Sequence, residues 1–247
     1  MFLVAFILGL RGMRWVCKKE GIDPERMETL LSYVFVGTLV GARLGHCLFY
    51  DPAYYFSNPL EIFAIWQGGL ASHGGVTGVI LAVALYVYRN RDLNFFWVAD
   101  RVSIFTAFAG GFIRIGNLMN SEIIGKPTGS NYGFIFSHID QVPRHPTQIY
   151  ESTSYFLLGL GLLWLYRRYQ HKPPPGLLIG IALAVVFSAR FILEFFKENQ
   201  ETFENALPIN MGQILSIPFC LLGIYLAVSS LKKAKLMKTV KPVKKKK

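Results

Sequence analysis

Residues 176–196 read GLLIGIALAVVFSARFILEFF, an almost unbroken apolar run whose only charged members are Arg190 and Glu194. A helix needs about 20 apolar residues to cross the hydrocarbon core of a bilayer. The run therefore predicts a membrane-spanning helix. Ionisable side chains are costly inside a membrane and usually mark functional sites, so Arg190 is also a candidate site residue.

Further apolar runs lie before and after this segment. They predict spans at Thr29–Tyr50, Leu70–Tyr88, Val102–Met119, Tyr150–Tyr166 and Met211–Ser230. A seventh run, Met1–Cys17, has only ten residues before Arg11, so we expect it to be the inner half of a first helix that begins before Met1. The predicted fold is an all-α polytopic membrane protein: a seven-helix transmembrane bundle with a truncated first helix.

The composition of the 247-residue chain favours a membrane protein over other classes. Hydrophobic residues make up 52% of the chain and charged residues only 17%, whereas soluble domains carry about 25% charged residues. A net charge of +11 is typical of nucleic-acid-binding proteins, but this apolar content is not, so we expect no nucleic-acid partner. The cysteines, Cys17, Cys47 and Cys220, are scattered, which fits neither a disulfide framework nor a zinc site.

The basic residues predict the orientation of the bundle. Of the 26 lysines and arginines, 20 lie in alternate segments that share one side of the membrane, three lie in the connections on the other side, and three lie within spans. Cytoplasmic loops collect Lys and Arg. We therefore expect the C-terminus inside and, across seven crossings, the N-terminus outside.

Small residues recur every four positions in two of the predicted spans. They are Gly37, Gly41 and Gly45, and then Gly74 and Gly78. This spacing is typical of closely packed membrane helices, so it predicts a tight bundle but indicates no particular function. No inverted repeat relates the two halves of the sequence, which weakens the case for a transporter.

Four ionisable side chains from four different predicted spans lie at a similar depth, roughly 5–10 Å below the outer interface at a rise of 1.5 Å per residue. They are Arg43, His73, Arg114 and Arg190. An ion path would distribute such groups across the whole membrane, whereas a single level favours a site for a molecule in the outer leaflet. Three guanidinium groups favour an anionic partner, and Arg binds phosphate through its bidentate fork. Phospholipid headgroups are the anions at that depth.

Structural roles stay open for two of the arginines. Arg190 and Glu194 are four residues apart on a predicted helix and could neutralise each other, without excluding a functional role for Arg190. Arg43 could extend to the interface, or it could pair with Glu61 or Asp51.

Arg114 differs from these two because no acidic residue lies within one turn on its own helix. Asn117, three residues later, shares its helix face, and Asn120 continues the polar track. The sequence therefore favours a functional role for Arg114.

Two histidines are further candidates. His73 precedes two glycines, which let another chain or a lipid approach closely. His145 lies at the outer start of a predicted helix, before a proline that suits a first turn. We expect His46 and His138 to be structural. Scattered histidines without paired carboxylates do not indicate a metal site, so we expect neither a metal nor another cofactor.

Six sequence blocks carry a family resemblance. They are GARLG (41–45), GGLASHGG (68–75), GFIRIGNLMNSEIIG (111–125), RHPTQIYE (144–151), SARFILEF (188–195) and MGQILSIP (211–218). Together they resemble the prolipoprotein diacylglyceryl transferases. The blocks occur in that family's order and extend from about the first cytoplasmic loop to the last span.

The resemblance implies an enzyme of the bacterial inner membrane that works on phosphatidylglycerol and prolipoprotein signal peptides. Such an enzyme moves the diacylglyceryl group to the sulfhydryl of a cysteine in the signal peptide, forms a thioether and releases glycerol phosphate. We expect residues 1–231 to form one transmembrane catalytic domain, monomeric in the bilayer. We expect residues 232–247, with nine lysines, to form a basic cytoplasmic tail, the one segment where disorder stays open.

The matching motifs imply the site residues. We expect His73, or alternatively His145, to be the base that activates the thiol, because a thiol must become a thiolate before it attacks carbon. We expect Arg114 and Arg190 to hold the phosphate as charge departs with it. The expected substrate-binding residues are Arg43, Asn117, Asn120, Glu122, Gly125 and Glu194.

Two other functions compete with this one. A lipid or anion transporter of the inner membrane predicts polar groups along the whole path and internal symmetry. A structural scaffold gives no reason for His and Arg to converge at one depth.

Overall fold

The computed structural model describes residues 1–198 and 209–239. Its α-helices are α1 (Phe2–Glu20), α2 (Arg26–Phe49), α3 (Pro52–Ser57), α4 (Ser72–Arg89), α5 (Phe95–Met119), α6 (Thr147–Arg168), α7 (Leu177–Leu193) and α8 (Met211–Thr239). Its 3₁₀-helices are η1 (Pro59–Phe63), η2 (Ile65–Gln67) and η3 (Glu194–Phe196). Two short antiparallel strands are β1 (Phe134–Ile135) and β2 (Pro143–Arg144).

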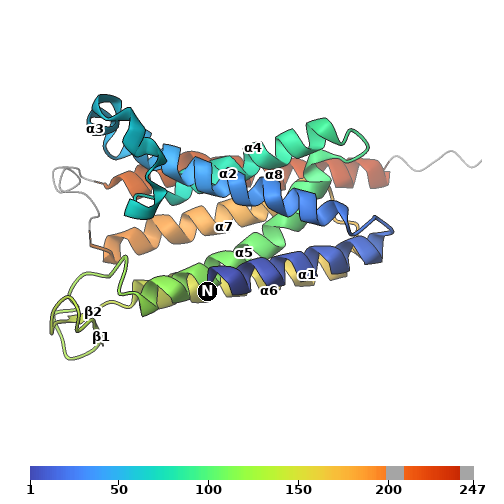
Figure 1. The fold of residues 1–247 in the computed structure, drawn as a ribbon. Coiled ribbons are helices and arrows are strands. Elements are labelled where there is room, and N and C mark those ends of the chain that lie inside the picture. Colours follow the sequence, from blue (N-terminus) through green and yellow to red (C-terminus); the bar gives the residue numbers. More distant parts are fainter. Residues whose placement is uncertain (199–208, 240–247) are drawn as a thin grey trace, which may run out of the picture.

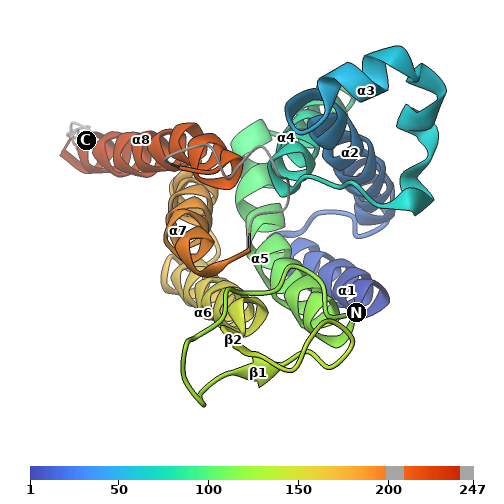
Figure 2. The ribbon, with the colours of Figure 1, turned by 90° about the vertical axis from the view of Figure 1, so that its left-hand side faces the viewer.

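The long helices run side by side, and α3 and the two strands lie at the same end of the bundle, here called the loop end, on opposite sides of it (Figure 1 and Figure 2). Helix α5 lies in the middle of the bundle in the end-on view of Figure 2 and contacts α1, α4, α6 and α7. The chain begins part-way along the bundle, and α1 runs from there to the end opposite the loop end (Figure 1).

Four helices are long and apolar enough to cross a membrane. They are Arg26–Phe49, Phe95–Met119, Leu177–Phe196 and Met211–Leu236. The structure thus confirms a helical, multi-pass membrane protein. The two-residue strands are the one departure from the predicted all-α fold within the described part of the chain.

Helix α5 begins at Phe95, earlier than the predicted span at Val102, because the polar residues before that span have partners. The side chain of Asn94 caps the first turn of α5. The carboxylate of Asp100 is buried and accepts hydrogen bonds from backbone N–H groups at the start of α7. Arg101 pairs with an acidic residue of α1 at 3.1 Å. Local hydropathy cannot reveal such partners.

Helix α8 continues past the predicted end of its span at Ser230 and ends at Thr239. Lys, Leu and Met are good helix formers, so the first lysines of the predicted tail extend the helix. Disorder is therefore not the state of residues 232–239. Residues 240–247 of the predicted tail lie outside the described residues.

The glycine pattern accounts for the packing of α2 against α4. At Gly41 and Gly74, an added side chain would overlap the backbone of the facing helix. An added side chain at Gly78 would likewise overlap the backbone of Gly37. The predicted close packing is confirmed. It holds α4, and with it His73, firmly against α2.

Candidate active site

A buried ion pair joins α5 to α6 near the loop end. The Nε atom of Arg114 lies 2.6 Å from Oε2 of Glu151. Glu151 is completely buried, and an unpaired charge in such a place would cost several kcal/mol. The pair therefore fixes both the position of the Arg114 guanidinium and the contact between the two helices.

Three more charged side chains complete a group that we call the charge cluster: Arg114, Glu151, Arg190, Glu194 and Lys197. Nζ of Lys197 lies 2.8 Å from Glu151 and 3.1 Å from Glu194. Arg190 lies 3.9 Å from Glu151 and 3.8 Å from Glu194. All five side chains are buried. The cluster holds three cations and two carboxylates, so its excess positive charge suits an anionic ligand.

A chain of hydrogen bonds leads from the charge cluster to the surface. Arg114 donates to Asn117 at 3.2 Å, and the Asn117 amide donates to the Glu122 carboxylate at 2.7 Å. Asn120 donates to the other oxygen of Glu122 at 3.3 Å. The predicted grouping of Asn117 with Arg114 is confirmed, and Glu122 and Asn120 lie next to it.

The segment that carries Glu122 is fixed to α6 in a strained conformation. The side chain of Gln148 donates to the backbone carbonyl of Glu122 at 2.7 Å, and that of Thr147 donates to Ile123 at 3.2 Å. Ile123 has a φ of 53°, which is rare for a β-branched residue. Such strain persists only where the surroundings enforce it, and it concentrates at functional sites.

Gly125 ties this segment to the charge cluster through the backbone. It forms a β-bridge with Lys197, and an added side chain would overlap the backbone of His145. Gly125 thus provides the close approach that brings Lys197 and the start of α6 together. The structure gives Gly125 a packing role.

His73 lies at the start of α4 and is 3% exposed. Its Nε2 atom lies 3.2 Å from the hydroxyl of Ser216 on α8, and its ring stacks on Phe187 of α7 with a 5.3 Å centroid distance. Helix α8 also contacts the charge cluster, because an added side chain at Gly212 would lie 2.8 Å from Glu194. His73 and the charge cluster are therefore linked through one turn of α8.

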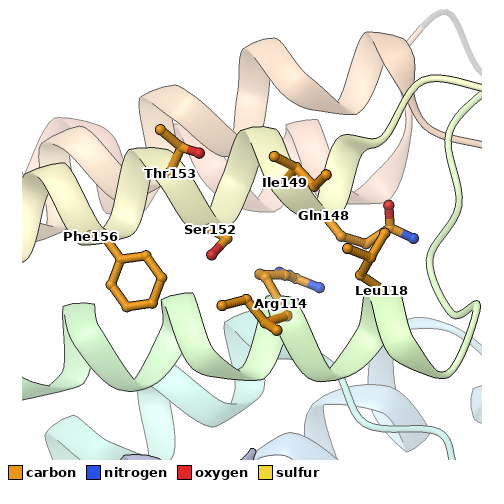
Figure 3. A pocket seen from close by; sticks show the side chains of 8 residues that line it. Arg114, Leu118, Gln148, Ile149, Ser152, Thr153 and Phe156 are labelled. Atoms are coloured by element: carbon orange, nitrogen blue, oxygen red, sulfur yellow. The ribbon is translucent and has the colours of Figure 1, made fainter. Parts of the chain in front are cut away.

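A cavity of about 240 Å³ lies between α5 and α6, next to the Arg114–Glu151 pair. Figure 3 shows the side chains of Arg114 and Leu118 from α5 and of Gln148, Ser152 and Phe156 from α6 around this space. Arg114 and Gln148 supply polar groups, and the rest of the lining is mainly apolar. Small-molecule pockets usually have about 300 Å³ or more, so the cavity suits part of a substrate.

Arg43 lies apart from the charge cluster. Its guanidinium donates to four backbone carbonyls of the connection between α2 and α4: Glu61 at 2.6 Å, Ile62 at 2.9 Å, Gly68 at 2.7 Å and Gly69 at 3.4 Å. Arg43 is 3% exposed. Among the described residues the Arg43 guanidinium donates to backbone carbonyls and not to a carboxylate, so pairing with the side chain of Glu61 or Asp51 is wrong. Arg43 holds this connection in place.

Within the described part of the chain, neither a hydrogen bond nor an ion pair joins the His145 ring to the charge cluster, although His145 lies beside Gly125. It is half-buried, and its ring lies 5.2 Å from Phe196 and 6.4 Å from Tyr150, measured between centroids.

The predicted partnership of Arg190 with Glu194 is confirmed as a contact. Glu151 and Glu194 meet Arg114 and Arg190 in the charge cluster. The shared depth of the two arginines indicated this convergence.

The sequence reasoning missed Glu151, Lys197 and Ser216. Glu151 is the only acidic residue in the predicted span at Tyr150–Tyr166, so the rule for ionisable residues in membranes could have found it. Lys197 follows Glu194 at helical spacing, which was a weaker signal. Ser216 gave none.

Comparison with known proteins places this chain in a family. The family model described as Prolipoprotein diacylglyceryl transferase matches residues 1–229. The chain is 48% identical to the phosphatidylglycerol–prolipoprotein diacylglyceryl transferase of Tolumonas auensis, over 94% of this chain and 90% of the relative. It is 45% identical to the protein of that name from Chloroherpeton thalassium, over 96% of this chain and 89% of the relative. The chain belongs to the prolipoprotein diacylglyceryl transferase family.

Proposed function

We propose that this chain transfers the diacylglyceryl group of phosphatidylglycerol to a cysteine thiol in the signal peptide of a prolipoprotein. A thioether forms, and glycerol phosphate leaves. The names of the relatives give both phosphatidylglycerol and prolipoprotein. The observation that carries the proposal is the charge cluster: buried, with excess positive charge, and linked to His73 through α8. A lipid or anion transporter is not favoured by this family relationship.

The charge cluster explains how the phosphate would be held. Arg114 lines the cavity between α5 and α6, and Glu151 holds its guanidinium in one orientation. Arg190 supplies a second guanidinium on the other side of Glu151. Cations fixed in advance stabilise the charge that develops on a departing phosphate ester, without reorganisation during the reaction.

His73 is the better supported of the two candidate bases. It is buried and linked to the charge cluster, whereas His145 packs against Phe196. A thiol has a pKa of about 8.5, so transfer at neutral pH benefits from a base close to it. We expect His73→Gln to abolish transfer and His145→Gln to reduce it less, in protein that elutes and unfolds like the wild type.

The remaining substrate-binding residues follow from their contacts. Asn117 and Glu122 orient Arg114 or the lipid headgroup, together with Asn120. Glu194 keeps Arg190 and Lys197 in place. Gly125 and Arg43 act on the substrate only through the segments that they hold.

The topology proposed for this chain is a monomer with seven spans in the bacterial inner membrane. The N-terminus would lie outside and the C-terminus inside, with residues 1–231 as the catalytic domain. The distribution of Lys and Arg supports this orientation. This orientation would put the loop end, and therefore the charge cluster, at the outer side of the membrane.

The test is a transfer reaction with purified protein in nanodiscs. Nanodiscs with phosphatidylglycerol are mixed with a synthetic prolipoprotein signal peptide, and the peptide mass is measured. We expect a diacylglyceryl adduct on the cysteine peptide and none on the matched serine peptide. An adduct on neither peptide, with folded protein, would overturn the proposal.

A further inference from the structure

The contacts of Ser216 bear on which ring nitrogen of His73 carries a proton. Ser216 is completely buried on α8, and its hydroxyl donates to the backbone carbonyl of Gly212 at 2.6 Å. A serine hydroxyl has only one proton. Because that proton points at Gly212, the Ser216 oxygen can only accept a hydrogen bond from His73, whose Nε2 lies 3.2 Å away.

The other ring nitrogen is then unprotonated. A neutral imidazole carries one N–H and one lone pair, so a proton on Nε2 leaves the lone pair on Nδ1. The Nδ1 atom of His73 is buried and accepts no hydrogen bond from the described residues. An unsatisfied buried polar atom costs free energy and is a reason to look for a ligand that supplies the missing donor.

We propose that Ser216 is a positioning residue that holds His73 with its proton on Nε2, so that Nδ1 takes the proton of the substrate thiol. This proposal rests on the proposed function. It goes beyond naming a histidine as base, because it identifies the reacting atom and the residue that prepares it.

The transfer can then be written with all protons and electron pairs placed. The S–H bond of the cysteine breaks, and its proton moves to Nδ1 of His73. The thiolate attacks the glyceryl carbon that bears the phosphate oxygen, and a C–S bond forms as the C–O bond breaks. The electron pair of that bond leaves with glycerol phosphate, beside Arg114 and Arg190. The proton on Nδ1 then passes to water or to the released phosphate.

The packing of α8 explains why His73 and the cations of the charge cluster keep a fixed relative position. Gly212 supplies the carbonyl that orients the Ser216 hydroxyl, and the same glycine approaches Glu194 of the charge cluster. One turn of α8 thus orients the base at one point and contacts the phosphate-binding group at another.

Threonine and valine at position 216 form a matched pair for the test. Their side chains have nearly the same shape, but only threonine keeps the hydroxyl, which can still bond the carbonyl four residues earlier in a helix. Ring-nitrogen NMR on ¹⁵N-histidine-labelled protein in nanodiscs reads the tautomer, and His73→Gln assigns the signal. Turnover with the signal peptide is measured on the same samples.

In the wild type and in Ser216→Thr, we expect His73 to be protonated on Nε2 alone. In Ser216→Val, we expect the Nε2 signal to shift and a Nδ1–H form to appear. Because general base catalysis contributes about 10²–10⁴-fold, partial loss of the correct tautomer predicts a fall in kcat of about 10-fold or more for valine, with an unchanged KM for phosphatidylglycerol.

Three outcomes would overturn the proposal: a wild-type proton on Nδ1, ring signals in Ser216→Val identical to the wild type, or an equal loss of kcat in both variants. The NMR measurement needs no turnover. If the wild type shows the predicted tautomer but transfers nothing, the proposed function is refuted. The role of Ser216 is then decided by the NMR comparison of the two variants alone.

Discussion

Nε of Arg114 on α5 and Oε2 of Glu151 on α6 are held 2.6 Å apart in a buried ion pair. Neither residue has a partner of opposite charge on its own helix at this level. The pair therefore does two things at once: it joins two helices, and it presents an oriented guanidinium to the cavity between them.

Replacing Glu151 by Gln should destabilise the protein strongly. The change keeps the shape of the side chain but leaves Arg114, Arg190 and Lys197 with only Glu194 to balance them. Removing one partner of a buried ion pair costs about 3–5 kcal/mol. Unfolding in nanodiscs or mild detergent measures this loss. The matched control is Glu28→Gln, at an exposed pair with Arg14, where a change of about 1 kcal/mol or less is expected. Equal effects in the two variants would contradict a structural role for Glu151.

Replacing Gly125 by Ala should displace the segment that carries Glu122. The added methyl group would overlap the backbone of His145, and overpacking of this kind costs about 1–3 kcal/mol. We expect little transfer activity and lower thermal stability. Gly161→Ala is the control, because no atom lies within 4 Å of the added group. A Gly125→Ala variant as active as Gly161→Ala would show that the close approach to His145 is not needed.

Replacing Arg43 by Gln should free the connection between α2 and α4. The guanidinium donates to four backbone carbonyls in this connection, and a hydrogen bond to a charged group contributes about 1.5–3 kcal/mol. We expect faster proteolysis within residues 51–69 and lower stability. If Arg43 instead binds the lipid phosphate directly, the variant will have a raised KM for phosphatidylglycerol and a wild-type proteolysis rate.

Acid should weaken the connection between α5 and α6. The side chain of Arg144 donates to Asp140 at 2.6 Å, and this hydrogen bond holds the pKa of Asp140 below its ordinary value of 3.8. A carboxyl group with a lowered pKa stabilises the folded state above its unfolded pKa, and this contribution is lost as the pH falls through the folded pKa. NMR titration should therefore show Asp140 ionised below pH 3.8 in the wild type. In Arg144→Gln, the pKa of Asp140 should rise; the same midpoint in both proteins would refute the pairing.

Much of the architecture follows from the sequence because its causes are local. Apolar length determines where a span lies, and the glycines at Gly41 and Gly74 determine how closely two helices approach. The convergence of Arg114 and Arg190 also follows, because membrane depth can be counted along each span.

The partners of these residues could not be predicted in the same way. Whether Glu151 faces Arg114 depends on how α6 is rotated against α5, which no local pattern specifies. The N–H groups of Arg43 donate to backbone carbonyls. Because every residue type has a backbone carbonyl, the sequence carries no signal for these hydrogen bonds. Lys197 follows a span and resembles a surface cation, yet the β-bridge to Gly125 encloses it.

In the proposed reaction, Arg114 holds the phosphate of the lipid as an oriented, two-pronged donor while the thiol attacks. The most direct measurement compares the wild type with Arg114→Lys in the transfer reaction, with peptide mass as the readout and unfolding as the control for structure. Lysine keeps the positive charge but is a point donor without the planar fork. We predict that folded Arg114→Lys loses transfer by about 10²-fold or more, the effect of removing one donor that stabilises a transition state. Transfer by Arg114→Lys at the wild-type rate would contradict the account.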